Sequence, residues 1–364
     1  MNVLKNKLQI MKNVQLSITL LFCLILAQIT PSKAQLIGPR VSQKSSVTQR
    51  IGITDITIEY ARPAVKGRQV LGKLIPYKSR FPWRAGANEN TTVQFAHDVF
   101  IEGQLLQAGK YGLHMLPAKG QDWTVIFSKK NEAWGSLGYN AKDDALRVKV
   151  KPENRSTHQE FLLYHFINLS ETSATIALDW DKFRIPIKFS IANPQELVIN
   201  DFRSKLTGAY GFSWQNLTTA GSYYLKHNKY LKEALLIADR AIRTYPKWDT
   251  YSLKSAILRK MGRIKEANTL DKYKINTIAN ENELNQWGYY LLNQKKFEEA
   301  IQIFELNVKK HPKAPNVYDS LAEGYMMKGD KKKAIRYYKK VLNMNPSKFL
   351  KNHASQQLKK LEGK

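Results

Sequence analysis

Four alanines recur at a nearly constant interval in the C-terminal half of this chain. The spacings are 33, 33 and 34 residues, between Ala234, Ala267, Ala300 and Ala334. Other positions repeat in the same frame around the last two alanines, namely Trp287/Leu321, Leu291/Tyr325, Phe304/Tyr338 and Pro312/Pro346. A period near 34 residues, with a small residue inside each second helix, is typical of paired helices stacked into a solenoid. The sequence therefore predicts an all-α repeat array, a class whose surfaces bind other proteins.

The repeat region is predicted to span residues 213–348, in about four units. The second unit, residues 249–280, is degenerate because it keeps Ala267 but lacks a closing proline. The units at residues 281–314 and 315–348 resemble tetratricopeptide (TPR) repeats, a family of helix–turn–helix units. A lysine-rich segment, residues 349–364, follows with an apolar stripe, and we expect it to cap the open end of the stack.

The TPR resemblance implies a partner groove lined by the first helix of each unit. On that alignment the groove candidates are Asn216, Tyr223, Arg259, Asn285, Tyr289, Asn293, Asp319, Glu323 and Met326. Thr219 and Tyr223 stand where chaperone-binding relatives carry a lysine and asparagine clamp, which argues against a terminal carboxylate as the ligand. The implied partner is a protein or peptide.

The N-terminal half shows the period-2 pattern of strands with one buried face. In residues 174–180, Ala174, Ile176, Leu178 and Trp180 alternate with more polar positions. Glu102-Gly103 and residues 119–122 separate apolar runs in the manner of hairpin turns. Repeated antiparallel hairpins favour a β-sandwich or jelly-roll-like domain. The fold class expected for the whole chain is thus an antiparallel β domain followed by an all-α TPR-type solenoid.

Several motifs of the N-terminal half occur together in one order. They are residues 55–68, Trp83-Arg-Ala-Gly-Ala-Asn-Glu89, Gly109-Lys-Tyr-Gly-Leu113, Trp123-Thr-Val-Ile-Phe127 and Trp134-Gly135. Together they resemble the DUF2911 family of exported bacterial proteins, over about residues 40–190. The resemblance implies a domain and a location outside the cytoplasm, in Bacteroidota above all, and it implies no reaction.

Arginines and aromatic rings crowd together in residues 60–89. Arginine can hold a carboxylate or phosphate through two hydrogen bonds, and an aromatic face can stack on a sugar or a guanidinium. We therefore take this segment as a candidate ligand site, with the residues Tyr60, Arg62, Arg68, Trp83, Arg84, Asn88 and Glu89. The alternative is internal: Arg84 pairs with Glu89 or Asp55 and ties a long connection onto the sheet.

Sequence patterns of catalysis and metal binding are missing. The histidines of the β domain have no His-Glu-x-x-His or comparable ligand spacing, so no metal site is expected. The glycines near Lys110 depart from a phosphate loop, because Tyr111 stands where Ser or Thr would bind the metal ion. No Gly-x-Ser-x-Gly elbow occurs either. The sequence assigns no catalytic residue and predicts no cofactor.

The N-terminus is typical of a cleaved signal peptide. Three lysines precede an apolar stretch over residues 14–29, and Ser32-Lys33-Ala34 places small residues before a predicted cleavage after Ala34. Polar residues interrupt the stretch, which falls short of the ~20 apolar residues of a stable span, so no transmembrane segment is expected in the mature chain. Cleavage would remove Cys23, the single cysteine, and with it disulfide and thiolate chemistry. The protein is predicted to be periplasmic or secreted.

The positive charge of the chain is unevenly distributed. Residues 201–364 carry 32 Lys+Arg against 15 Asp+Glu, whereas residues 35–200 carry 22 against 15. A surplus of this size attracts anionic surfaces, which makes an anionic polysaccharide or a membrane surface an alternative partner. Nucleic acid is not expected to be the physiological target of an exported protein. A lysine-rich helix is also commonly just a solvated face.

A connector helix is predicted between the two halves. Asn193-Pro194-Gln195-Glu196 combines a capping residue, a first-turn proline and an acid that can reach back to the cap. The predicted organisation is then a signal peptide at 1–34, a β domain at 35–192, a connector at 193–212, the repeats, and the cap.

Our leading hypothesis from the sequence is a non-catalytic, exported protein-binding scaffold with the β domain as a second binding surface. The alternative is an enzyme or a carbohydrate-handling β domain, with the repeats used for assembly. Convergence of Arg62, Arg84 and Glu89 on an open cavity beside a perturbed acid or histidine would favour the enzyme. Pairing of these side chains with each other under cover would count against it.

Overall fold

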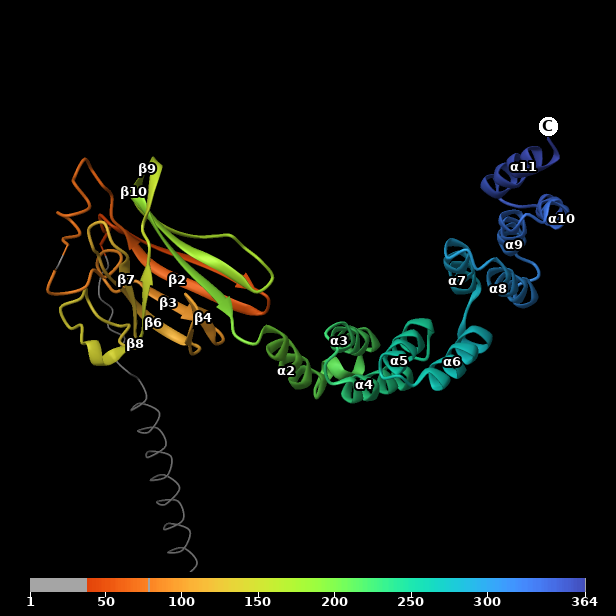
Figure 1. The fold of residues 1–364 in the computed structure, drawn as a ribbon, viewed down its shortest axis with the longest axis horizontal. Helices are drawn as coiled ribbons and strands as arrows, with labels where there is room; N and C mark the ends of the chain where they lie inside the picture. Colours follow the sequence, from red (N-terminus) through yellow and green to blue (C-terminus); the bar gives the residue numbers. More distant parts are fainter. Residues whose placement is uncertain (1–37, 78, 364) are drawn as a thin grey trace, which may run out of the picture. The chain divides into compact units, whose positions relative to one another are not determined.

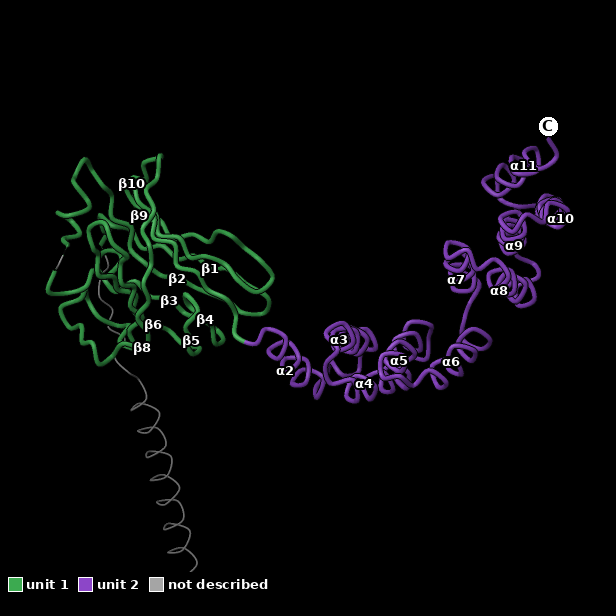
Figure 2. Tube along the Cα trace, in the orientation of Figure 1, with its two compact units in different colours: residues 1–192 green, residues 193–364 purple. Residues whose placement is uncertain are grey.

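The computed structural model describes residues 38–77 and 79–363. The chain divides into two compact units, residues 1–192 and 193–364 (Figure 2). The predicted signal peptide, residues 1–34, lies outside the described residues. Within the described ranges, no helix combines the length and the hydropathy that a membrane span requires. The expected fold class is confirmed: the first unit is an antiparallel β-sandwich and the second an all-α TPR-type array (Figure 1).

Two antiparallel sheets make up the N-terminal unit. The larger has the order β1-β2-β3-β6-β7-β8, and the smaller has the order β5-β4-β10-β9. Their strands are β1 (Gln43–Ile51), β2 (Thr54–Arg62), β3 (Thr92–Phe95), β4 (Val99–Ile101), β5 (Gln104–Leu106), β6 (Gly109–Leu116), β7 (Trp123–Ser128), β8 (Asp144–Val150), β9 (Glu153–Ile167) and β10 (Ser173–Ile191).

The β4–β5 hairpin shows how local sequence sets a turn. Glu102 and Gly103 both have positive φ, 47° and 81°, which is the backbone of a type I′ turn. Gly103 adopts this conformation without a steric penalty, because it has no Cβ. The register that follows pairs Ile101 with Gln104, so the sequence signal at this dipeptide leads directly to the strand pairing.

The core of this unit lies between the two sheets. Phe95 of β3 approaches Phe189 of β10 with ring centroids 6.2 Å apart, and Trp123 of β7 approaches Phe183 of β10 at 5.6 Å. These contacts join opposite sheets, which identifies the packing as face to face. Burying an apolar side chain of this size stabilises the fold by roughly 1.5–3 kcal/mol.

A long connection between β2 and β3 is fastened to the sandwich by backbone hydrogen bonds. Trp83 N donates to Met115 O (2.7 Å), and Met115 N donates to Trp83 O (2.8 Å). A second isolated bridge joins Glu89 to Trp134. Tyr164 adds a side-chain bond, since its hydroxyl donates to Ala85 O at 2.9 Å. Trp83, Ala85 and Glu89 of the connection are thus held against the sandwich by these bonds.

Helices α2 to α11 form the C-terminal unit as successive hairpins (Figure 1). Their bounds are α2 (Pro194–Leu206), α3 (Trp214–Lys226), α4 (Leu231–Thr244), α5 (Trp248–Lys260), α6 (Ile264–Tyr273), α7 (Glu281–Asn293), α8 (Phe297–Lys310), α9 (Pro315–Lys328), α10 (Lys331–Leu342) and α11 (Lys348–Glu362).

The recurring alanines lie where paired helices cross. Ala234, Ala267, Ala300 and Ala334 sit in α4, α6, α8 and α10, and each is fully buried. A methyl group at such a crossing lets the two backbones approach closely. Larger aromatic side chains of the same unit, such as Phe304 and Tyr338, fill the space to the next helix and are themselves fully buried.

The start of α2 differs from the sequence expectation in one respect. The helix begins at Pro194, but Asn193 has a left-handed backbone (φ 48°) and makes no side-chain capping bond. The expected capping by this asparagine is therefore wrong. Glu196 of the first turn instead pairs with Lys229 at 2.7 Å, and Ile199 packs with Tyr224 in the core of the first repeat. At this helix start the ion pair between Glu196 and Lys229 is formed, and the side-chain cap expected from Asn193 is not.

The described hydrophobic core of the helical unit is discontinuous. Two clusters gather residues of α2 to α5, and a third gathers residues of α7 to α11. Between them, α6 passes into a π-helical turn, Lys274–Ile278. Lys274 is buried there, with Nζ 4.0 Å from the Trp248 ring centroid and 5.6 Å from that of Trp287. A cation held between two indole rings thus bridges the degenerate second repeat and the third.

Candidate functional site

The arginines of residues 60–89 are engaged by the backbone of the domain itself. Arg62 Nε donates to Leu162 O at 2.9 Å, and its guanidinium lies over the Phe161 ring. Arg68 donates to the carbonyls of Val65 and Ala64, at 3.0 and 2.6 Å. Arg84 donates to the carbonyl of Asn88. These arginines therefore tie the connection in place. An internal role of this kind was the alternative expected for Arg84, although with Glu89 or Asp55 as its partner.

The remaining candidates of the segment divide between the core and the surface. Tyr60 is 3% exposed, and its hydroxyl accepts a hydrogen bond from the backbone N–H of Tyr164 (3.1 Å). Trp83 stacks on Trp180 with centroids 6.0 Å apart. Asn88 donates through Nδ2 to the carbonyl of Ser42 at 3.1 Å. Arg62, Arg84 and Glu89 do not converge on one open cavity.

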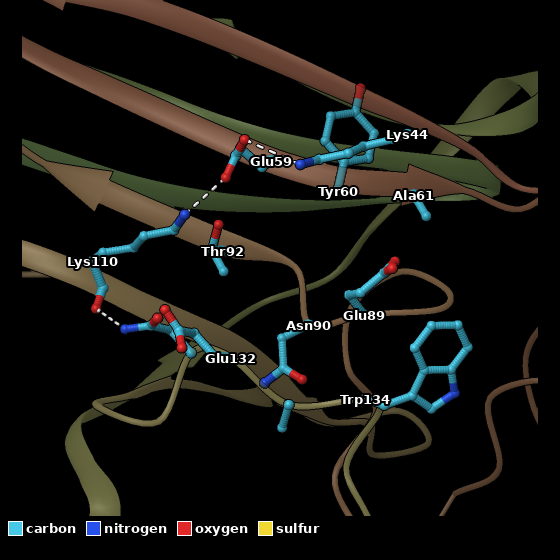
Figure 3. Close-up of a pocket in the computed structure, with 12 residues that line it drawn as sticks. Lys44, Glu59, Tyr60, Ala61, Glu89, Asn90, Thr92, Lys110, Glu132 and Trp134 are labelled. Atoms are coloured by element: carbon cyan, nitrogen blue, oxygen red, sulfur yellow. Dashed lines mark hydrogen bonds and ion pairs between the residues drawn. The ribbon is translucent and has the colours of Figure 1, made fainter. Parts of the chain in front are cut away.

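A cavity of about 460 Å³ lies beside this segment and takes in two of the predicted residues, Tyr60 and Glu89 (Figure 3). Its lining comes from β1, β2, β3 and β6, from the end of the β2–β3 connection and from the loop after β7. The other lining residues are Lys44, Glu59, Ala61, Asn90, Thr92, Lys110, Asn131, Glu132, Ala133 and Trp134.

Charges inside the cavity balance each other. Glu59 lies between Lys110 (2.8 Å) and Lys44 (3.3 Å), and the hydrogen bond from Lys110 holds the pKa of Glu59 below its usual range (Figure 3). At the rim, Arg40 pairs with Glu89, lowers the pKa of that carboxyl, and stands 5.5 Å from the Trp134 ring centroid. Trp134 is 59% exposed. The cavity therefore offers paired charges and one open aromatic face.

Behind the rim, a buried histidine holds the loop that carries Trp134. Ser136 Oγ and His114 Nδ1 lie 3.1 Å apart. The Asn90 amide is oriented so that its nitrogen donates to the carbonyls of Ala133 and Gly135. Its oxygen then accepts from His114 Nε2 at 3.3 Å. This leaves Nδ1 as the acceptor of the Ser136 hydroxyl. Burial lowers the pKa of His114 to about 4.

The same network sets a limit on the chemistry of Ser136. A general base works best with a pKa near the operating pH. With a pKa of about 4, the His114 imidazole is neutral at neutral pH and takes up a proton only weakly. A smaller cavity of about 220 Å³ is lined by Ser136 and Arg84 together with Trp83 and Leu137. The geometry favours a positioning role for His114, which fixes the loop under Trp134.

Glu59 and Trp134 line the cavity but were not among the predicted site residues, although the sequence pattern marks both of them. Glu59 alternates with the buried Ile58 and Tyr60 on β2, and Trp134-Gly135 belongs to the DUF2911-like motifs. Lys110 belongs to another of these motifs, whereas Lys44 had no signal. Both lysines reach Glu59 from other strands, and the pairings of β1 with β2, β2 with β3 and β3 with β6 bring the three together.

Three groove candidates of the helical unit meet across neighbouring first helices. Tyr289 of α7 donates through its hydroxyl to Glu323 Oε2 of α9 at 2.8 Å. Asp319, one turn before Glu323, lies 2.9 Å from His353 Nδ1 of α11. Both pairs are separated by 34 residues, the period of the repeat. We name Tyr289, Asp319, Glu323 and His353 the polar face of α7, α9 and α11.

Of the other groove candidates, Asn293 borders the polar face, since it follows Tyr289 by four residues on α7, and the rest lie apart from it or pack into the core. Arg259 reaches Asn268 and Asp271 of α6, and Met326 packs against the apolar cluster of the last repeats. Asn293 is exposed at the end of α7. Asn216 donates through its side chain to Tyr210 O, and the Tyr223 ring contacts the rings of Phe202 and His227. The Oδ1 atom of Asn285 is buried and has no hydrogen-bond partner among the described residues.

Comparison with known families places the N-terminal domain. Residues 42–189 match the DUF2911 family model. The description of that model is "Protein of unknown function (DUF2911)", and the resemblance expected from the motifs is confirmed. The match covers the strands of both sheets and the cavity with Trp134, so we refer to this unit as the DUF2911-like domain. No curated protein matches the chain.

Solved structures similar to the helical unit are TPR proteins and related repeats. PilF of Pseudomonas aeruginosa shares 18% identity over 42% of this chain and 69% of its own (TM-score 0.27). YrrB, described as a TPR protein with an unusual peptide-binding site, shares 20% over 45% and 89% (TM-score 0.26). The C-terminal part of a TPR repeat-containing protein from Cytophaga hutchinsonii shares 18% over 46% and 74% (TM-score 0.29). The repeat fold of this chain itself follows from its own helix pairs.

Proposed function

We propose that this protein is an exported, non-catalytic scaffold whose helical repeats bind a protein or peptide partner. The DUF2911-like domain supplies a second binding surface in this proposal. Export is supported by the lysines, the apolar stretch and the small residues that precede Gln35. Partner binding is supported by the repeat architecture, since stacked hairpins present an extended face built from equivalent positions of successive units.

One observation carries the proposal: the first helices of the last repeats share a polar, hydrogen-bonded face. Tyr289 bonds to Glu323 and Asp319 bonds to His353, so α7, α9 and α11 hold these side chains in place before any partner arrives. Fixed side chains lose little conformational freedom on binding, which favours affinity. The face carries two acids within a strongly basic part of the chain, and it therefore suits a segment with hydrogen-bond donors or a positive charge.

The proposal is tested by adding the same bulky ring to a first helix and to a second helix. Asn293→Tyr modifies an exposed position at the end of α7, and Arg336→Tyr modifies an exposed position of α10. Full-length protein is crosslinked in the cell envelope, and captured proteins are quantified by mass spectrometry. We expect Asn293→Tyr to reduce a specific partner at least tenfold and Arg336→Tyr to leave it unchanged. Equal capture by both variants and the parent protein would contradict the proposal.

A second candidate function is ligand binding in the cavity of the DUF2911-like domain. The exposed indole of Trp134 and the paired charges of Glu59 and Glu89 favour a ligand with both a flat face and polar groups, as in a sugar chain. Intrinsic fluorescence is titrated with a neutral and with an acidic oligosaccharide, using Trp134→Ala as the control. A saturable change that Trp134→Ala abolishes supports the cavity as a site. No change with either probe removes carbohydrate from consideration.

Attachment to an anionic surface is distinguished from both candidates by its response to salt. The surplus of basic residues in the helical unit attracts anionic polysaccharide or lipid through screened charge interactions. Retention on vesicles with anionic lipid is measured at rising ionic strength. Loss of retention near physiological salt assigns it to diffuse charge, whereas a partner held by the polar face stays bound.

A further inference from the structure

The polar face contains three potential metal ligands from two helices. Asp319 and Glu323 are four residues apart on α9, so their side chains lie on the same side of the helix. His353 comes from α11. One ligand atom of each residue lies within 4.8 Å of the other two. Tetrahedral zinc with bonds of about 2.0–2.1 Å sets its ligand atoms roughly 3.4 Å apart, so small side-chain movements suffice.

Two carboxylates of this cluster lie close together without a Lys or Arg partner among the described residues, whereas several other acids of the helical unit have one. Glu233 pairs with Arg203, Asp239 with Lys254, and Asp271 with Arg259. Among the described residues, Asp319 and Glu323 have no Lys or Arg partner within ion-pair distance, and His353 is the one basic group against them.

Burial at Asp319 adds to this imbalance. Asp319 is 5% exposed, and the basic group recorded against its carboxylate is His353, at 2.9 Å. Removing a carboxylate from water without a compensating charge is costly. The site therefore lacks positive charge, in a chain that has a large surplus of it elsewhere.

An orphaned hydroxyl points to a missing group at the same place. Tyr338 of α10 is fully buried, and its hydroxyl has no hydrogen-bond partner among the described residues. The Tyr338 ring meets the His353 ring edge to face, with ring centroids 6.1 Å apart, so this buried phenol adjoins the cluster. A buried hydroxyl without a partner costs about 1–3 kcal/mol. A water molecule on a bound metal ion would give it a partner.

Neighbouring groups orient the ligands as metal sites require. Gln357 Nε2 lies 3.3 Å from His353 Nε2, and Nδ1 faces Asp319. With the Gln357 amide turned so that Oε1 accepts from Nε2–H, Nδ1 is left unprotonated and can bind an ion. The Tyr289 hydroxyl donates to Glu323 Oε2 at 2.8 Å and leaves the other carboxylate oxygen free of that bond. Such outer partners fix the ring orientation and the carboxylate in metal sites. The arrangement thus has ligands, orienting groups and one position open for water.

We propose that Asp319, Glu323 and His353 bind a zinc ion in the last TPR repeat. Two carboxylate oxygens and one imidazole nitrogen suit zinc, whereas magnesium and calcium prefer oxygen ligands alone. The ion joins α9 to the capping helix α11. The sequence showed no metal motif, because the ligands become neighbours only through the 34-residue stacking of successive first helices. This inference uses side chains of the same polar face, but it is tested by metal binding alone, so it can fail without deciding whether the face binds a partner.

The test uses the full chain, freed of metal with a chelator that is then removed. Isothermal titration with zinc chloride and with magnesium chloride measures stoichiometry and affinity, and cobalt(II) is added as a spectroscopic probe of tetrahedral geometry. We expect one zinc per chain, a visible cobalt band, and no magnesium binding. Zinc at 100-fold excess over its Kd raises the melting temperature of the helical signal by about 5–10 °C.

Variants decide whether the cluster is the site. Asp319→Asn and His353→Gln preserve shape, and each is expected to weaken zinc binding at least 100-fold and to abolish the cobalt band. The control is His158→Gln, since His158 stands between Glu160 and Asp181 on the β domain and tests the competing surface cluster. Zinc binding that survives in Asp319→Asn and His353→Gln, or that is absent from the parent chain, overturns the proposal. Folding of each variant is checked by circular dichroism.

Discussion

Gly288 tests the idea that small residues let the repeat helices cross. In α7 this glycine faces Phe304 of α8, which is fully buried. A Cβ at position 288 would stand 2.2, 2.6 and 2.7 Å from three atoms of the Phe304 ring. Carbon atoms in contact prefer about 3.5–4.0 Å, so the ring or a helix must shift by more than about 1 Å. The ring has no free space, because it is enclosed on all sides.

A neighbouring glycine supplies a matched control against the same ring. At Gly324 of α9, an added Cβ would lie 3.1 Å from Phe304 Cδ2 and 3.4 Å from Ile301 Cγ1. Both substitutions to alanine gain about 1 kcal/mol of helix propensity. Overpacking costs about 1–3 kcal/mol and applies mainly to Gly288→Ala. We therefore expect Gly288→Ala to be less stable than Gly324→Ala by about 2 kcal/mol.

The two variants are compared by thermal melts of the helical circular dichroism signal and by hydrogen exchange. For a domain of this size, about 2 kcal/mol corresponds to about 4–8 °C in melting temperature. Faster exchange in Gly288→Ala is expected to begin in α7 and α8, because repeat arrays open locally. Adding Phe304→Leu to Gly288→Ala should recover part of the loss. Equal melting temperatures for the two alanine variants would refute the close-crossing argument.

The remaining predictions concern the β domain. Asp179→Asn should destabilise this domain by about 3–5 kcal/mol in urea unfolding, because Asp179 is 2% exposed and is bonded to Arg184 (2.7 and 2.8 Å) and His165 (2.9 Å). Burial acts to raise the pKa of Asp179, but the hydrogen bonds from Arg184 and His165 outweigh burial and lower this pKa. The contribution of Asp179 to stability is therefore present above the pKa of the unfolded state and is lost as acid protonates the carboxylate. Folding lowers the pKa of His114 from 6.5 to about 4, so the unfolded chain binds a proton first as the pH falls. The free energy of unfolding should therefore drop by about 3 kcal/mol between these two pH values, and His114→Gln should remove this pH dependence. Trp134→Ala should change the unfolding free energy by less than about 0.5 kcal/mol, because the indole is 59% exposed, and a larger loss would show a structural role.

Local patterns accounted for much of the fold. Glu102-Gly103 predicted a hairpin because two adjacent residues with positive φ close β4 onto β5. The alanine period predicted the helix pairs because a small buried side chain lets two helices cross closely. Asn193 shows the limit of such patterns, since a contact between Glu196 and Lys229 at the same helix start took precedence over the expected cap.

Candidate sites were harder to predict, because their residues come from separate strands and helices. The arginines of residues 60–89 suggested a ligand site by composition, but Arg62, Arg68 and Arg84 donate to backbone carbonyls. The cavity beside them takes Lys44 and Lys110 from other strands. Composition indicates which groups are available, whereas strand pairing decides which of them face each other.

The sequence by itself determined the kinds of element and their order, because turn dipeptides, alternation and the 33 to 34 residue period act over short distances along the chain. It also placed Tyr289 and Glu323, and Asp319 and His353, one period apart. Only the tertiary structure decided that these pairs meet, and that the Tyr338 hydroxyl has no hydrogen-bond partner within residues 38–77 and 79–363. The physical reason is that contact depends on how closely successive helices pack, and small side chains such as Gly288 and Ala300 set that distance.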